Sequence, residues 1–184
     1  MSSNDNHESQ LAIYRPWLRL LAGLEIHSRY QGKFSASDVV QQTMLEAWRH
    51  WDDFRGDEEG RRAWLRQILA FQLAKLGRAY GETRKRDIRR ERSIEASMAE
   101  SSLRLADILP SDQTSPTDRA IANEQHLRLC AALERLPADY RHVIMLRNMQ
   151  ELSYEQISQQ MDRSVGAVKM LWVRALQALK HAMA

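Results

Sequence analysis

Aromatic rings and cations alternate along residues 61–92 in a pattern that suits the binding of a nucleic acid. This stretch holds eleven Lys or Arg against three Asp or Glu, a net +8, whereas the whole chain carries +3. Positive charge attracts phosphates, and rings such as Trp64, Phe71 and Tyr80 can stack on unpaired bases. Alternatively, the rings belong to the core and only the cations are exposed. Both can hold, with Trp64 mostly in the core.

Residues 152–176 are a second candidate for DNA binding, because they predict two helices separated by a tight turn. Ser153 and Gln156 have the spacing of a capping box, and Ser164 can cap the second helix. This layout is typical of a DNA-reading helix-turn-helix, although a helical hairpin that only packs shares it. The expected buried stripe of the second helix consists of Val168, Leu171, Trp172, Ala175 and Leu179.

Patterns for catalysis or metal binding are weak. The six histidines form no His-x-x-x-His or His-Glu-x-x-His pair, and no glycine-rich phosphate loop or nucleophile elbow occurs. The single cysteine, Cys130, excludes an internal disulfide and lies in an apolar pattern that predicts a core position. The acidic loop 52–60 lacks the spacing of a calcium loop. We therefore expect no enzyme activity, no metal site and no cofactor.

The composition predicts an all-helical chain, since only seven of 184 residues are Gly and four are Pro. Ser37 is the expected N-cap of the second helix, and 27–36 and 52–60 are expected loops. No apolar run reaches membrane-spanning length and no signal-peptide core is present, so we expect a cytoplasmic protein without membrane contact. Outside the helix-turn-helix, apolar spacing predicts helices over residues 11–26, 38–51, 61–80, 120–136 and 140–149.

Two small helical domains joined by a flexible linker are the expected organisation. We place the first domain at residues 1–95, the linker at 96–119 and a helix-turn-helix domain at 120–184. The linker assignment depends on residues 110–117, which are rich in Pro, Ser and Thr, whereas residues 93–109 keep some helical character.

The order of several motifs resembles that of bacterial sigma-70-type factors, most of all the extracytoplasmic-function (ECF) group. In the first half the matching motifs are Ser37-Asp-Val-Val-Gln-Gln-Thr-Met-Leu-Glu-Ala-Trp48, Phe54-Arg-Gly56 and Ala63-Trp-Leu-Arg-Gln-Ile-Leu69. In the second half they are Ala132-Leu-Glu-Arg-Leu-Pro-Ala-Asp-Tyr-Arg141, Leu152-Ser-Tyr-Glu-Gln-Ile157, Ser164-Val-Gly-Ala-Val-Lys169 and Arg174-Ala175. Any one motif is weak, but their ordered combination is specific.

The resemblance implies a sigma factor that binds core RNA polymerase, recognises −35 DNA and melts the −10 region of promoters. Its implied partners are the β′ clamp and the β flap of the polymerase, promoter DNA in double- and single-stranded form, and an anti-sigma factor. A stand-alone helix-turn-helix regulator is the alternative binding module, and a metal-dependent nuclease is the alternative enzyme. The implied polymerase-binding residues are Asp38, Gln41, Gln42, Glu46 and Trp48.

Two sets of residues are implied to contact promoter DNA. For the −10 region and the DNA upstream of it, they are Phe54, Arg55, Arg61, Arg62, Arg66, Phe71, Lys75, Arg78, Arg84, Lys85 and Arg86. For the −35 element, they are Arg163, Ser164, Lys169, Met170, Val173 and Arg174.

The chain departs from the family pattern at both DNA surfaces. Phe71 and Lys75 replace an Asn and an Asp that the family often has in its melting helix. Ala167-Val-Lys-Met-Leu171 stands where the family often has Thr-Val-Lys-Ser-Arg. The second change predicts fewer hydrogen bonds to bases and more dependence on thymine methyl groups or DNA shape.

Overall fold

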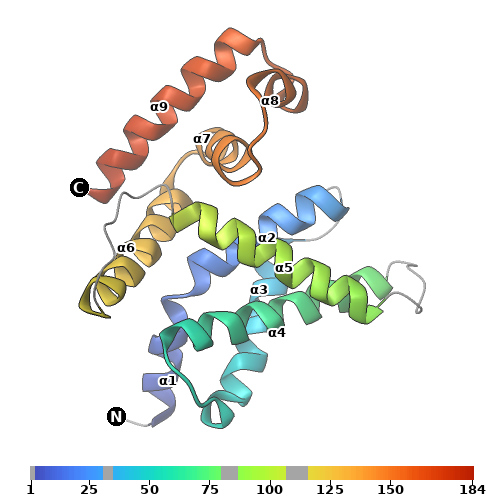
Figure 1. Cartoon of the computed structure of the whole chain (residues 1–184), viewed down its shortest axis with the longest axis vertical. Coiled ribbons are helices and arrows are strands. Elements are labelled where there is room, and N and C mark those ends of the chain that lie inside the picture. Colours follow the sequence, from blue (N-terminus) through green and yellow to red (C-terminus); the bar gives the residue numbers. More distant parts are fainter. Residues whose placement is uncertain (1–2, 31–34, 80–86, 107–115) are drawn as a thin grey trace. The chain divides into compact units, whose positions relative to one another are not determined.

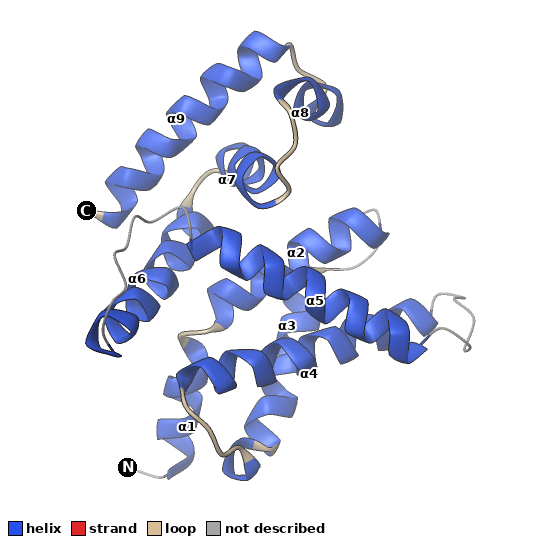
Figure 2. Cartoon of the chain, viewed as in Figure 1, coloured by secondary structure: helices blue, strands red, loops and turns tan. Residues whose placement is uncertain are grey.

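The computed structural model describes residues 3–30, 35–79, 87–106 and 116–184 (Figure 1). Among these residues every regular element is a helix (Figure 2). The chain divides into two compact units, Met1–Glu100 and Ser101–Ala184, which confirms the predicted all-α class with two helical domains.

The first unit is built around three helices. Helix α2 (Arg15–Tyr30) packs against α3 (Ala36–Arg49) and α4 (Glu58–Ala79), and α3 and α4 pack against each other. A polar helix, α1 (Ser3–Ala12), lies against α3, and a 3₁₀ turn, η1 (Trp51–Asp53), precedes α4. The fully buried large side chains of this core include Tyr14, Trp17, Leu18, Leu21, Leu65, Leu69 and Leu73.

Helix α5 (Asp87–Ala106) crosses the division between the units, because Glu100 and Ser101 are consecutive residues within it. Ile94 and Met98 are buried on its first-unit side. On the second-unit side, Arg104 donates a hydrogen bond to the backbone oxygen of Met149 at 2.9 Å.

The second unit is built around its last helix, which packs against three other helices. Helix α9 (Val165–Met183) packs against α6 (Pro116–Arg135), α7 (Ala138–Ile144) and α8 (Tyr154–Met161). Helix α7 continues into a π-helical turn, η3 (Met145–Met149), before the chain reaches α8. The core includes Leu129, Leu133, Ile144, Ile157 and Val168, and Cys130 is buried as predicted.

Several predicted boundaries are wrong. Helix α3 is capped by Ser35 and not by Ser37, and the Ser35 side chain makes no capping hydrogen bond. The expected loop 27–36 is helical up to Tyr30, and the expected loop 52–60 contains η1 and the first residues of α4. The domain bounds 1–95, 96–119 and 120–184 remain a prediction. Within 96–119, α5 continues to Ala106, as the helical character expected of residues 93–109 indicated, α6 starts at Pro116, and residues 107–115 lie outside the described residues.

Candidate nucleic-acid and protein interfaces

Two capped helix starts fix the predicted helix-turn-helix. The Ser153 hydroxyl accepts from the Gln156 backbone N–H at 3.2 Å, and the Ser153 N–H donates to Gln156 Oε1 at 2.8 Å. Asp162 ends α8 in the left-handed conformation with φ 51°. The Ser164 hydroxyl then accepts from the Ala167 N–H at 3.2 Å and starts α9. Both predicted caps are confirmed, and the turn they enclose is only three residues long.

Helix α9 has one buried and one exposed face. Val168, Ala175 and Leu179 are buried, while Leu171 and Trp172 of the predicted stripe are only half-buried. Trp172 lies at the edge, where its Nε1–H donates to Asn148 Oδ1 at 3.1 Å and its ring meets Tyr154 edge-on. The residues exposed on the other face include Lys169, Met170, Val173 and Arg174.

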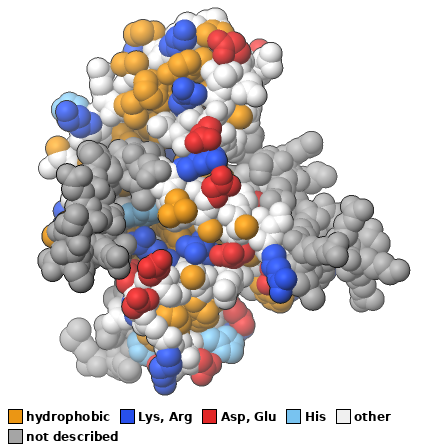
Figure 3. All heavy atoms as spheres, in the orientation of Figure 1, with side chains coloured by type: hydrophobic (Ala, Val, Ile, Leu, Met, Phe, Trp, Pro, Cys, Tyr) orange, Lys and Arg blue, Asp and Glu red, His pale blue; other side chains and the backbone are white. Residues whose placement is uncertain are grey.

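The remaining two residues of the −35 set have structural contacts. Arg163 forms an ion pair with Asp139 of α7, and Ser164 is the N-cap described above. Lys169 lies over the Tyr154 ring, with Nζ 5.5 Å from the ring centroid. In the space-filling view, hydrophobic and cationic side chains lie next to one another on the second unit (Figure 3).

The residues predicted to bind polymerase lie on the outer face of α3. Asp38, Gln41 and Gln42 are exposed, Glu46 is half-buried, and Trp48 is 42% exposed, while the opposite side of α3 is buried. Leu45, which is 40% exposed, lies on this face but was not in the predicted set. Its spacing from Gln41, Gln42 and Trp48 could have identified it, because residues three and four apart share a helix face. We call Asp38, Gln41, Gln42, Leu45 and Trp48 the α3 surface.

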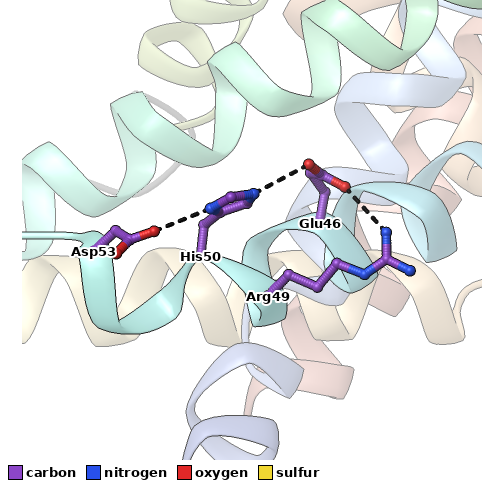
Figure 4. Close-up of polar contacts among 4 residues, drawn as sticks. All are labelled: Glu46, Arg49, His50 and Asp53. Atoms are coloured by element: carbon purple, nitrogen blue, oxygen red, sulfur yellow. Dashed lines mark hydrogen bonds and ion pairs between the residues drawn. The ribbon is translucent and has the colours of Figure 1, made fainter.

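An ionic cluster lies at the C-terminal end of the α3 surface (Figure 4). His50 Nδ1 is 3.0 Å from Asp53 Oδ2, and His50 Nε2 is 3.4 Å from Glu46 Oε1. Arg49 pairs with the other Glu46 oxygen at 3.6 Å. The hydrogen bond with Asp53 and the nearby negative charge of Glu46 raise the pKa of His50. Glu46 thus already has two partners, Arg49 and His50, at the end of α3.

Phe54 and Arg61 of the −10 set belong to a cluster of rings. The Phe54 ring stacks on Trp64 with centroids 5.2 Å apart, and Trp51 lies 6.4 Å from Trp64. The Arg61 guanidinium is 4.9 Å from the Trp51 centroid and 5.7 Å from that of Phe54. The nearby Arg55 donates to the backbone oxygens of Asp52 and Phe54. These cation–ring contacts help to order the loop between α3 and α4.

Three arginines of the −10 set have acidic partners. Arg61 and Arg62 pair with Glu58 at 3.6 and 3.9 Å, and Arg66 pairs with Glu95 of α5 at 3.4 Å. Glu58 also accepts a hydrogen bond of 2.6 Å from the Tyr14 hydroxyl. Burial, followed by this hydrogen bond, raises the pKa of Tyr14 to about 12.

The outer face of α4 presents the rest of the described −10 set. Phe71 is 45% exposed and Lys75, four residues later, is exposed as well. Arg78 lies on the same face, with its guanidinium 5.9 Å from the Phe71 centroid. Arg84, Lys85 and Arg86 lie outside the described residues, as does Tyr80. An exposed ring between cations is the arrangement that unpaired bases need for stacking.

Within the part of the chain that the structure describes, no three His, Cys, Asp or Glu side chains gather in a way that could hold a metal ion. In the same residues, no helix combines the length and apolar character needed to cross a membrane.

Comparison with known proteins finds one family match in each of the two units. The family model "Sigma-70 region 2" matches residues 13–79, and "Sigma-70, region 4" matches residues 126–179. The chain is 34% identical over 154 residues to the ECF RNA polymerase sigma-E factors of Salmonella typhimurium LT2 and Escherichia coli K12, covering 84% of this chain and 76% of each relative. The sigma-E factor of Haemophilus influenzae is 28% identical over 155 residues, covering 84% and 77% of the two chains.

A solved complex of the sigma factor RpoE with the anti-sigma factor NepR from Bartonella quintana also matches. It is 24% identical and covers 97% of this chain and 96% of that chain, with a TM-score of 0.34.

Proposed function

The chain belongs to the ECF group of the sigma-70 family and directs transcription initiation, and on this premise we propose which of its surfaces meet polymerase and promoter. The first unit binds core RNA polymerase at the β′ clamp and opens the −10 region. The second unit recognises −35 DNA and meets the β flap. The domain bounds 1–95, 96–119 and 120–184 belong to this proposal. The factor has no catalytic activity of its own and works in the bacterial cytoplasm, and an anti-sigma factor is a further partner.

The observation that carries the proposal is the α3 surface. Trp48 and Leu45 leave large apolar areas exposed among the polar side chains of Asp38, Gln41 and Gln42. Exposed aromatic residues within a polar rim are typical of the centre of a protein interface. A regulator that binds duplex DNA alone has no need for such a surface on a separate unit.

The outer face of α4 supports promoter opening by the same unit. Phe71 can stack on an unpaired base while Lys75 and Arg78 follow the backbone phosphates. Extrusion of a base costs a few kcal/mol, which stacking and backbone contacts have to offset. Phe71 thus supplies stacking where the family often has a polar side chain.

Reconstitution with core polymerase tests the proposal. The purified chain is mixed with core enzyme, and transcripts from a promoter library are sequenced. We expect initiation at promoters that share two elements, and no specific initiation by either component alone. Duplex binding by the free chain without polymerase-dependent initiation would instead indicate a stand-alone regulator.

Two substitutions on the second unit extend this test. Lys169→Ala and Arg174→Ala should each weaken initiation that depends on the −35 element, because both side chains are exposed on the proposed DNA face. Lys180→Ala is the matched control, since Lys180 is also exposed but lies near the end of α9. Unchanged initiation by both test variants would show that this face does not meet DNA.

A further inference from the structure

We propose that this factor reads its −35 element through the methyl groups of thymine, which contact Met170 and Val173 of α9; the inference rests on the proposed function. Met170 is 54% exposed and Val173 is 41% exposed, although both are apolar. Neither side chain can donate a hydrogen bond, and only the Met sulfur is a weak acceptor. Their contribution to recognition therefore has to come from apolar contact.

The helical period places these two side chains at the centre of the DNA-facing surface. Successive residues of an α-helix are rotated by roughly 100°, so Lys169, Val173, Met170 and Arg174 follow one another across an arc of about 140°. The cations stand at the two edges of this arc and the apolar residues stand between them. Edge cations can reach the phosphates on either side of a major groove while the middle of the helix faces the base edges.

Gly166 extends the same surface by one turn. A Cβ atom added there would meet nothing within 4 Å, so the fold itself does not require glycine at this position. The bare backbone leaves room for the first turn of α9 to approach the DNA closely. Close approach is what short apolar side chains such as Val173 need to touch a base.

The chemistry of the major groove selects the base. Every base edge there offers hydrogen-bond donors or acceptors, and thymine alone adds an apolar group, its C5-methyl. Apolar side chains placed against guanine or adenine edges would remove water from polar atoms without replacing the lost hydrogen bonds. Met170 and Val173 therefore favour DNA sequences in which thymine methyl groups lie between the phosphates that Lys169 and Arg174 contact.

Replacing thymine by deoxyuridine tests the proposal, because it deletes the methyl group and keeps the hydrogen-bonding pattern of the base. The full chain with core polymerase first selects its −35 element from a randomised library, and that element should contain thymine. Each thymine is then replaced by deoxyuridine, and holoenzyme affinity is measured. At contacted positions we expect a loss of about fourfold per methyl, the value that follows from burying one such group.

Substitutions in the protein connect the methyl effect to its residues. Met170→Gln and Val173→Asn replace the two apolar groups by polar ones of similar size and leave no side-chain methyl group, so together they should abolish the difference between thymine and deoxyuridine. Lys169→Ala is the control, since it should weaken binding to both DNAs alike and leave their ratio unchanged.

Each other outcome overturns the proposal. Specific initiation with equal affinity for both DNAs, or a selected element without thymine, would refute methyl readout while the sigma function stands. If deoxyuridine still lowers the affinity of the double variant, the methyl groups act through DNA shape or through contacts with other residues. Absence of any initiation with core polymerase would remove the proposed function and this inference with it.

Discussion

Truncation of Trp48 should weaken the binding of core polymerase. A tryptophan side chain presents up to about 250 Å², so the exposed 42% of Trp48 corresponds to about 105 Å² that an interface can bury. At about 25 cal/mol per Å² this area contributes about 2.6 kcal/mol, which is roughly a 70-fold change in Kd. Trp48→Ala should lose an effect of this size.

Competition of each variant against the labelled parent chain for core polymerase measures this loss directly. Ile13→Ala is the matched control, because Ile13 is 51% exposed on the same unit but lies outside the α3 surface. High concentrations of Trp48→Ala should restore initiation, since the defect lies in binding. Leu45→Glu provides a second variant that changes an exposed side chain and leaves the core intact. Parental affinity in both variants would refute the assignment of the α3 surface to polymerase.

Three further predictions concern single contacts. Tyr14→Phe removes the hydrogen bond to Glu58 and should lower the free energy of unfolding by about 1.5 kcal/mol. The folded-state pKa of Tyr14 is raised to about 12, whereas its ordinary value is about 10. The difference in unfolding free energy between parent and variant should therefore hold below about pH 10 and shrink as the pH rises to 12. A difference independent of pH would contradict the reasoning. Asp53→Asn should lower the pKa of His50 in an NMR titration of the imidazole, because Asp53 is the main cause of its raised value, and an unchanged pKa would show that Glu46 holds it. Lys169→Ala should reduce the slope of log affinity against log salt for −35 DNA by about 1, the contribution of one phosphate contact, and an unchanged slope would exclude that contact.

Local chemistry explains why the helix-turn-helix could be predicted closely. Both caps depend on side chains within three residues of the N–H groups that they satisfy, so the spacing of Ser153, Gln156 and Ser164 already contains the contact. The start of α3 was harder, since Ser35 and Ser37 can both act as caps. With Ser35 as N-cap, Asp38 falls at the third helical position, where an acid is close to the free N–H groups.

Tertiary contacts decided the features that the sequence did not predict. Helix α1 has little apolar periodicity, and its His7 ring lies 5.7 Å from that of Trp51, more than forty residues later. The pair of Arg66 with Glu95 joins two helices and has no local signal. By contrast, the pairs of Arg61 and Arg62 with Glu58 follow three- and four-residue helix spacing. That spacing could have shown that these two arginines have a partner within the helix.

The cations of the proposed DNA surfaces differ in whether they already hold a carboxylate, as Arg163 of the −35 set also does with Asp139. Arg61, Arg62 and Arg66 already hold carboxylates, so a phosphate has to replace an existing ion pair, and the exchange gains less than a new contact. Lys75 and Lys169 are exposed on helix faces. Lys169 lies over the Tyr154 ring, and its charge also acts on the exposed carboxylate of Glu155. Positive charge counted along the sequence thus overstates the attraction of the first unit for DNA. At that unit Phe71 has to supply by stacking what the paired arginines do not supply by charge.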